Sequence, residues 1–235
     1  MNRMTNELDG AVIVDFPLRG ERWVAVNTPG DRIPSHGTDM LGQRFAYDLI
    51  KVDARGPGLR YHSAGLLRGF LIGVLTRDCN AWGAEIHAPF DGEIVRAVDG
   101  VAERGWIHPL REPVLALKNA ATFNADRLPS VLGNHVLMRQ GDVFAGFAHL
   151  VPGSVAVASG QTVRTGEVLG RVGHTGNSTA AHLHFQLMDS DDLMHARGVP
   201  CAFRTYEVLR NGSWERVENA IPRKADRIRY LGADA

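Results

Sequence analysis

The chain has 235 residues, of which 44% are hydrophobic, so it is long enough to form one large or two small domains with a buried core. Lysine and arginine together number 26, as do aspartate and glutamate, and this balance excludes bulk charge as a basis for binding nucleic acid or an anionic membrane. The first ten residues contain no long apolar run after a basic head. From the sequence we therefore expect no signal peptide and no membrane span, which favours a cytoplasmic location. Cys79 and Cys201 could either pair in an oxidising compartment or remain buried thiols.

Short apolar runs in the first part of the chain predict β-strands. They cover residues 11–16, 22–26 and 43–52. In the third run, Arg44 and Asp48 would share one face, because side chains alternate along a strand. A carboxylate in an otherwise apolar strand needs a partner, since burying a lone charge is costly. The simplest such partner is an arginine in an ion pair, either Arg44 or another one.

The rest of the chain also predicts β structure. Asp91–Gly92 is a hairpin-type turn, and strands are expected at residues 134–139, 143–150 and 206–210. The connection over residues 100–133 is long, and we expect it to be functional or partly helical. Glycines that mark the successive turns of a tightly folded β sandwich stand at positions 160, 166, 170, 173 and 176.

Two histidines separated by one residue stand at the centre of the segment 175–186. In an extended strand His182 and His184 point to the same side, and Leu183 points to the other. Such a pair is either a combination of metal ligand and base or a chance arrangement, and the motif alone does not decide between them.

Several motifs in the same order carry a resemblance to a known family. They are Asn134–Met138, Phe147–Leu150, Val157–Gly170 and Gly173–Phe185. In sequence and spacing they resemble the core of the lysostaphin-type zinc metallopeptidases, hydrolases that cut peptide cross-links in bacterial peptidoglycan. The resemblance implies a mainly β fold, a two-sheet antiparallel β sandwich with the site in a groove on one sheet. The resemblance also implies action in the cell envelope. This conflicts with the cytoplasmic location that the N-terminal sequence favours.

The resemblance also assigns roles to four residues. Asp48 and His184 match zinc ligands, and His149 and His182 match the catalytic pair. Three protein ligands would leave zinc an open position, and imidazoles beside it would assist proton transfer and oxyanion stabilisation. The implied cofactor is therefore Zn²⁺, and the implied partner is a peptide or peptidoglycan substrate.

The first ligand of the family pattern is replaced in this chain. Arg44 stands four residues before Asp48, where the family has a histidine, and a guanidinium cannot ligate zinc. His36, in a turn-rich loop before the same strand, is the best substitute, because that loop could fold back beside Asp48. Three weaker substitutes are His62, His87 and His135, and His174 is interpreted as a turn residue.

Two functions from different classes follow. One is a zinc peptidase with an altered first ligand. The other is a non-catalytic relative, a binding or regulatory module in which Arg44 takes the place of the metal and neutralises Asp48. A biotinyl- or lipoyl-carrier domain is rejected, because residues 157–173 contain no lysine for attachment. We expect N-terminal strands at 1–30 packed on the core, a metallopeptidase-like domain at 31–205 and a C-terminal extension at 206–235.

Overall fold

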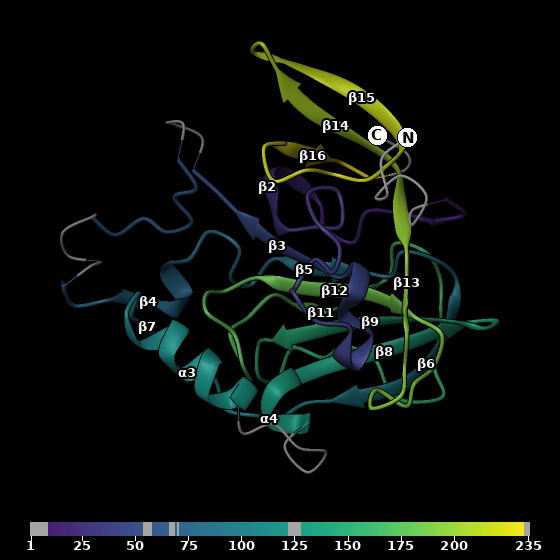
Figure 1. Ribbon diagram of the computed structural model, residues 1–235, viewed down its shortest axis with the longest axis horizontal. Helices are drawn as coiled ribbons and strands as arrows, with labels where there is room; N and C mark the ends of the chain where they lie inside the picture. The colour runs from purple at the N-terminus through teal and green to yellow at the C-terminus, as the bar shows by residue number, and fades with distance from the viewer. Residues whose placement is uncertain (1–8, 54–57, 66–68, 70, 122–127, 233–235) are drawn as a thin grey trace.

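The computed structural model describes residues 9–53, 58–65, 69, 71–121 and 128–232 (Figure 1). The helical segments are η1 (Met40–Phe45), η2 (Thr76–Asp78), α3 (Arg111–Ala121) and α4 (Leu128–Leu132). The strands are β1 (Val12–Val14), β2 (Gly20–Asn27), β3 (Tyr47–Lys51), β4 (Val74–Leu75), β5 (Glu85–His87), β6 (Gly92–Val98), β7 (Trp106–Ile107), β8 (Asn134–Gln140), β9 (Val143–Leu150), β10 (Thr162–Val163), β11 (Val168–Arg171), β12 (Leu183–Met188), β13 (Gly198–Val199), β14 (Cys201–Arg210), β15 (Ser213–Ala220) and β16 (Ile228–Tyr230).

Most strands belong to one 12-stranded sheet in the described part of the chain. Its order is β1-β14-β16-β2-β3-β12-β9-β8-β6-β10, with β13 beside β12 and β15 beside β14. The strands pair antiparallel except for β1 with β14. Two small sheets, β11-β5 and β4-β7, accompany it. The predicted mainly β, antiparallel fold is confirmed.

Strand β12 separates the core from a polar face. Leu183, Phe185 and Leu187 alternate into the main hydrophobic cluster, which also holds Ile86 of β5 and Leu169 of β11. The small β11-β5 sheet thus packs against the apolar side of the large sheet. The residues between these apolar positions point away from the core, and this leaves one face of β12 for polar chemistry.

The strand predicted over residues 43–52 begins later than expected. Residues 40–45 form η1, in which Leu41 (φ 57°) and Gly42 (φ 72°) leave the helical region. A Cβ at Gly42 would lie 2.6 Å from Met188 Cγ, so both the backbone and the space favour glycine. Arg44 consequently lies in a turn before β3, and the prediction that it shares a strand face with Asp48 is wrong.

Strands from both ends of the chain join the large sheet. β16 pairs with β2 and with β14, and the Tyr47 hydroxyl of β3 donates to the Cys201 carbonyl of β14 at 2.6 Å. The division at residues 30/31 and 205/206 stays a prediction. Residues 1–8 and 233–235 of the two outer segments lie outside the described residues.

The two cysteines are buried free thiols. Burial raises the pKa of Cys79 to about 11 and that of Cys201 to about 12. Of the two states that the sequence left open, the structure therefore shows the unpaired one.

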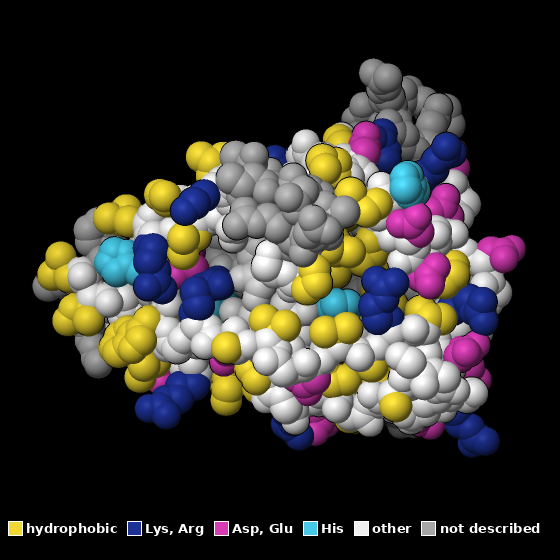
Figure 2. Space-filling model, turned by 90° about the horizontal axis from the view of Figure 1, so that it is seen from below, with side chains coloured by type: hydrophobic (Ala, Val, Ile, Leu, Met, Phe, Trp, Pro, Cys, Tyr) yellow, Lys and Arg dark blue, Asp and Glu magenta, His cyan; other side chains and the backbone are white. Residues whose placement is uncertain are grey.

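Charges of both signs are spread over the surface. On the face seen in Figure 2, Lys and Arg side chains are interspersed with Asp and Glu side chains, in keeping with the zero formal net charge. Within the described ranges, none of the helices has the length and apolar character that crossing a membrane requires.

Gly176 lies at a turn with no room for a side chain. Its φ is +70°, and an added Cβ would meet Gly133 N and Val131 O at 2.5 Å. We expect Gly176→Ala to lower the free energy of unfolding by about 3 kcal/mol, because a left-handed backbone and a backbone clash act together. Gly166 is the matched control, since its φ is +85° but the added Cβ would meet only the flexible Arg19 guanidinium at 3.2 Å. Gly166→Ala should cost about 1 kcal/mol, and equal losses in denaturant unfolding would contradict this account.

Candidate metal centre

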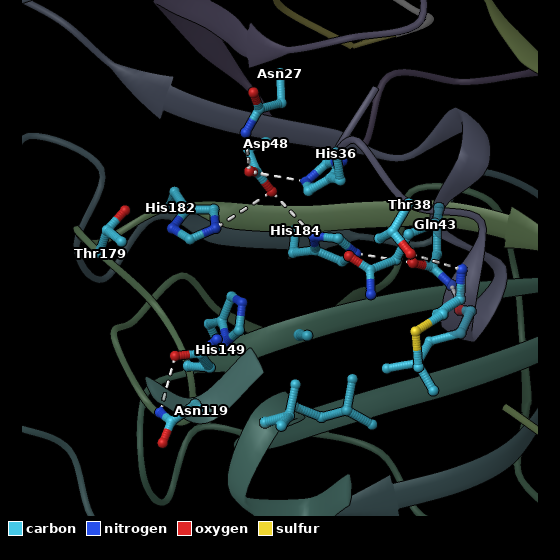
Figure 3. A pocket seen from close by; sticks show the side chains of 17 residues that line it. Asn27, His36, Thr38, Gln43, Asp48, Asn119, His149, Thr179, His182 and His184 are labelled. Atoms are coloured by element: carbon cyan, nitrogen blue, oxygen red, sulfur yellow. Dashed lines mark hydrogen bonds and ion pairs between the residues drawn. The ribbon is translucent and has the colours of Figure 1, made fainter. Parts of the chain in front are cut away.

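A pocket of about 460 Å³ opens on the polar face of β3, β12 and β9 (Figure 3). All five histidine and aspartate residues assigned to the site from sequence line it. The lining residues are Asn27, His36, Thr38, Met40, Leu41, Gln43, Asp48, Asn119, Val131, Leu132, Ala148, His149, Asn177, Thr179, His182, His184 and Gln186.

His36, Asp48 and His184 could hold a metal ion, and we refer to them as the metal cluster. His184 of β12 and Asp48 of β3 are direct cross-strand partners, so their side chains lie side by side on one face. His184 Nδ1 is 2.9 Å from Asp48 Oδ1, and His36 Nε2 is 2.9 Å from Asp48 Oδ2. One potential ligand atom from each of the three residues lies within 4.8 Å of the other two. Two imidazoles and a carboxylate can therefore reach one ion.

The loop before η1 brings His36 to the cluster. Ser35 N donates to Arg44 O at 3.0 Å, which closes the loop against the start of the strand segment. The His36 ring then lies edge-on to the His184 ring, with centroids 4.9 Å apart. The predicted approach of this loop to Asp48 is what the structure shows, while ligation itself stays a prediction.

The second nitrogen of each cluster histidine has its own partner. His184 Nε2 lies 2.8 Å from Gln186 Oε1, and Gln186 Nε2 in turn donates to Leu41 O at 2.7 Å. His36 Nδ1 lies 3.0 Å from Ser35 Oγ. The Gln186 amide oxygen and the Asp48 carboxylate oxygen both accept, so either ring nitrogen of His184 can carry the hydrogen, and with the hydrogen on Nε2 the Nδ1 nitrogen can act as a ligand. This outer arrangement is typical of metal-ligating histidines.

The Asp48 carboxylate is surrounded by donors. Burial by itself raises its pKa, but His36, His182 and His184 outweigh burial and hold the pKa well below the usual range. Asn27 Nδ2 also donates to Asp48 Oδ2 at 2.7 Å. The carboxylate is thus ionised and able to act as a ligand at neutral pH.

Arg44 is turned toward a different carboxylate. Its Nη1 donates to Asp39 Oδ1 at 2.6 Å, and its guanidinium lies 5.7 Å from the centroid of the Phe45 ring. Among the described residues, Asp48 contacts Asn27 and three histidines. The expected ion pair between Arg44 and Asp48 is therefore replaced by contacts with histidines.

His149 lies at the end of β9 with an unusual backbone. Its φ is 69°, a left-handed value that costs energy for a residue with a side chain. Its Nδ1 donates to Thr175 O at 2.9 Å, so Nε2 is the unprotonated nitrogen of the neutral ring. Burial, followed by the nearby His182 and His184, holds its pKa well below the usual value. His149 is therefore neutral at pH 7.

His182 lies between His149 and Asp48. Its ring centroid is 4.9 Å from that of His149, and its Nε2 is 3.3 Å from Asp48 Oδ1. Burial lowers the pKa of His182, but the charge of Asp48 and a hydrogen bond to it outweigh burial and raise the pKa above its ordinary value. The two imidazoles thus have opposite tendencies, one to stay neutral and the other to hold a proton.

The three weaker histidine candidates lie outside the pocket lining. His87 Nδ1 contacts Gly166 O in the small β11-β5 sheet, His135 Nδ1 contacts Gly133 O, and His62 forms an isolated bridge to Cys79. The structure does not bring them into the metal cluster.

Several residues around the site were not found from the sequence. Asn27 and Gln186 contact cluster residues, and Asn119 and Asn177 line the pocket and hydrogen-bond to each other at 2.9 Å. Gln186 could have been found, because it follows His184 by two residues and so shares its strand face. The other three depend on long-range contacts that no spacing reveals.

A comparison with protein families adds independent evidence. The model of peptidase family M23 matches residues 106–196. The predicted resemblance to the lysostaphin-type peptidases is confirmed. The segment that matches M23 holds His149, His182 and His184, while His36 and Asp48 precede it. Two of the five residues assigned to the site therefore lie outside the matched segment.

Three of the solved structures to which this chain is similar are described as peptidases. A zinc-containing peptidase from Vibrio cholerae is 23% identical, with 50% of this chain and 25% of that chain covered and a TM-score of 0.30. A putative peptidase M23 from Pseudomonas aeruginosa is 22% identical, with 51% and 37% covered and a TM-score of 0.32. The antimicrobial peptidase lysostaphin from Staphylococcus simulans is 23% identical, with 59% and 50% covered and a TM-score of 0.32. This chain spans between a quarter and a half of the length of these three proteins.

Proposed function

We propose that the protein is a zinc-dependent metalloendopeptidase that cleaves peptide cross-links of peptidoglycan or a related peptide. The observation that supports the proposal most is that His36, Asp48 and His184 lie together, with His36 close enough to Asp48 to supply the ligand that Arg44 cannot. His149 and His182 line the same pocket and are available for proton transfer beside the metal cluster. The family match supports a peptidase, and this geometry supports the zinc and the residues assigned to it.

The donor atoms fit zinc. Two imidazole nitrogens and one carboxylate form a ligand set of the kind found in catalytic zinc sites that keep an open position. His184 Nδ1 lies 2.9 Å from the ionised Asp48 carboxylate, and Gln186 Oε1 can accept the imidazole hydrogen at Nε2 when Nδ1 binds an ion. When bound, zinc supplies Lewis acidity toward a carbonyl oxygen and toward water.

The two remaining histidines would accept a proton and donate a hydrogen bond during peptide hydrolysis. His149, neutral and with Nε2 unprotonated, can accept a proton from an attacking water or hold that water in place. His182, with its raised pKa, can donate a hydrogen bond to the oxygen that gains negative charge as the peptide carbon becomes tetrahedral. Both side chains are buried, so their hydrogen bonds act in a medium of low dielectric.

The groove favours an uncharged peptide. A second pocket of about 240 Å³ adjoins the first and shares Asn27, Asp48, Thr179 and His182 with it. Its far wall is apolar and consists of Val26, Ile50, Leu59 and Tyr61. Among the described lining residues of both pockets, Asp48 is the one carboxylate and there is no lysine or arginine. Apart from Asp48, the described lining residues therefore offer no aspartate, glutamate, lysine or arginine as a counter-ion to a charged side chain of the substrate.

The test is hydrolysis with controlled metal. Chelator-treated protein is incubated with purified peptidoglycan and with synthetic peptides of uncharged residues, and newly formed amines are measured. We expect no cleavage without metal and cleavage once about one equivalent of zinc is added. Cleavage without metal would overturn the zinc assignment. Absence of cleavage from a zinc-loaded protein would favour the non-catalytic binding module.

A further inference from the structure

Two buried ionisable side chains outside the pocket lining have no role in the proposed reaction. Glu112, in the first turn of α3, is 1% exposed, and His174 is fully buried. Burying such groups is costly unless they are paired, so their retention needs a physical reason. Both lie within reach of Arg104.

Arg104 connects α3 to the segment that leads into β12. Its guanidinium forms an ion pair with Glu112 Oε2 at 3.2 Å, while Arg111 pairs with the other carboxylate oxygen at 2.8 Å. The Nη1 of Arg104 donates to Gly176 O at 2.7 Å, and its Nη2 donates to Ser178 O at 2.7 Å. One side chain therefore fixes the backbone of the turn that precedes His182.

Arg104 also fixes the direction of the hydrogen bonds that begin at His174. A guanidinium can only donate, so His174 Nε2, 3.2 Å from Arg104 Nη2, is an acceptor. Burial, together with the charge of Arg104, lowers the pKa of His174 to about 3, so the ring is neutral and its one hydrogen is on Nδ1. That hydrogen is donated to Ser178 Oγ at 2.9 Å.

From Ser178 the chain of contacts continues to His182. Because Ser178 Oγ accepts from His174, its own hydrogen is free to point toward Ala180 O, 2.5 Å away. The same carbonyl lies 2.8 Å from His182 Nδ1, and Ser178 Oγ lies 3.1 Å from that nitrogen. Since a carbonyl only accepts, His182 carries a hydrogen on Nδ1, and its Nε2 faces Asp48 and the pocket.

We propose that Arg104 is a positioning residue for His182, acting through His174 and Ser178. The path Glu112–Arg104–His174–Ser178–His182 holds the imidazole by its Nδ1 side and leaves Nε2 for the substrate. Its effect on turnover rests on the proposed peptidase function, whereas the proton positions along the path do not.

The first test reads the proton positions directly. Nitrogen-15 NMR of the imidazoles in metal-free wild-type protein should show His174 as the Nδ1–H tautomer. In Arg104→Gln the amide can either donate or accept, so His174 should become a mixture of tautomers. An Nε2–H tautomer of His174 in the wild type would overturn the proposal, whatever the activity of the protein.

The second test separates positioning from folding. His174→Leu removes both polar atoms, whereas His174→Gln keeps one donor and one acceptor. With zinc loaded and peptide as substrate, we expect kcat of His174→Leu to fall about tenfold to a hundredfold, less than the full contribution of a general acid or base. KM and zinc stoichiometry should stay within about twofold, and His174→Gln should recover most of kcat. An unchanged kcat in a folded His174→Leu protein, or a loss that follows the melting temperature in both variants, would overturn the proposal.

Discussion

Replacing His36 by alanine is expected to lower zinc affinity about as much as replacing His184. Each variant removes one of the three donors that lie within 4.8 Å of one another. Loss of an outer partner of a metal ligand already costs about 10- to 100-fold in affinity, so loss of the ligand itself should cost at least about 100-fold. Competition with a chromophoric chelator at limiting zinc measures this loss.

Arg44→His tests the alternative hypothesis that Arg44 takes the place of the metal. If Arg44 occupied the place of the metal, a histidine there would create or strengthen zinc binding, because it restores the family spacing to Asp48. Arg44 lies instead in η1 and contacts Asp39, so we expect Arg44→His to leave zinc affinity within about threefold, as for an ordinary surface change of at most about 0.5 kcal/mol. Full zinc occupancy of His36→Ala at limiting metal, together with tighter binding by Arg44→His, would reject His36 as the ligand.

His182→Ala is expected to keep zinc and lose turnover. His182 lies beside the metal cluster but supplies none of its three donors. Removing a general acid or base costs about 10²- to 10⁴-fold in rate, and kcat should fall by that amount while the zinc content stays near one equivalent. Single-turnover kinetics on the zinc-loaded protein measures the loss at the chemical step.

His195→Ala is the control for that experiment. The His195 side chain is 85% exposed and forms an ion pair with Asp192 outside the pocket lining. We expect its kcat and zinc content to match those of the wild type. If His182→Ala lost zinc in parallel with activity, a ligand role would replace the proposed proton-transfer role.

Strand alternation and the family resemblance were enough to predict the strongest part of the site. The His-x-His pair falls on β12, with His184 on the polar face and Leu183 in the core. The register of β12 with β3 then places His184 opposite Asp48. That pairing joins residues 136 positions apart, and only the resemblance supplied it.

The course of the chain around Arg44 could not be predicted from local pattern. Residues 43–52 have the alternation of a continuous strand, but the left-handed backbone at Leu41 and Gly42 makes a turn first. The same turn brings Ser35 to Arg44 O and so places His36 over Asp48. Turn geometry of this kind depends on packing against Met188, which is distant in sequence.

His174 shows a second limit of sequence reasoning. Between two glycines it has the pattern of a turn residue, yet it is fully buried in a polar network. Its partners Arg104 and Glu112 come from the long connection over residues 100–133, where the sequence predicted function or helix but no particular contact. Because these charged partners are distant in sequence, their contacts produce no periodic pattern in the sequence from which they could be predicted.

We expect this chain to hold one catalytic zinc through His36, Asp48 and His184. Calorimetric titration of metal-free protein with zinc tests it most directly, with X-ray absorption at the zinc edge on the same sample. We expect one equivalent of zinc to bind, with nitrogen and oxygen ligands that include two imidazoles. No binding at excess zinc, or a first shell containing sulfur, would contradict it.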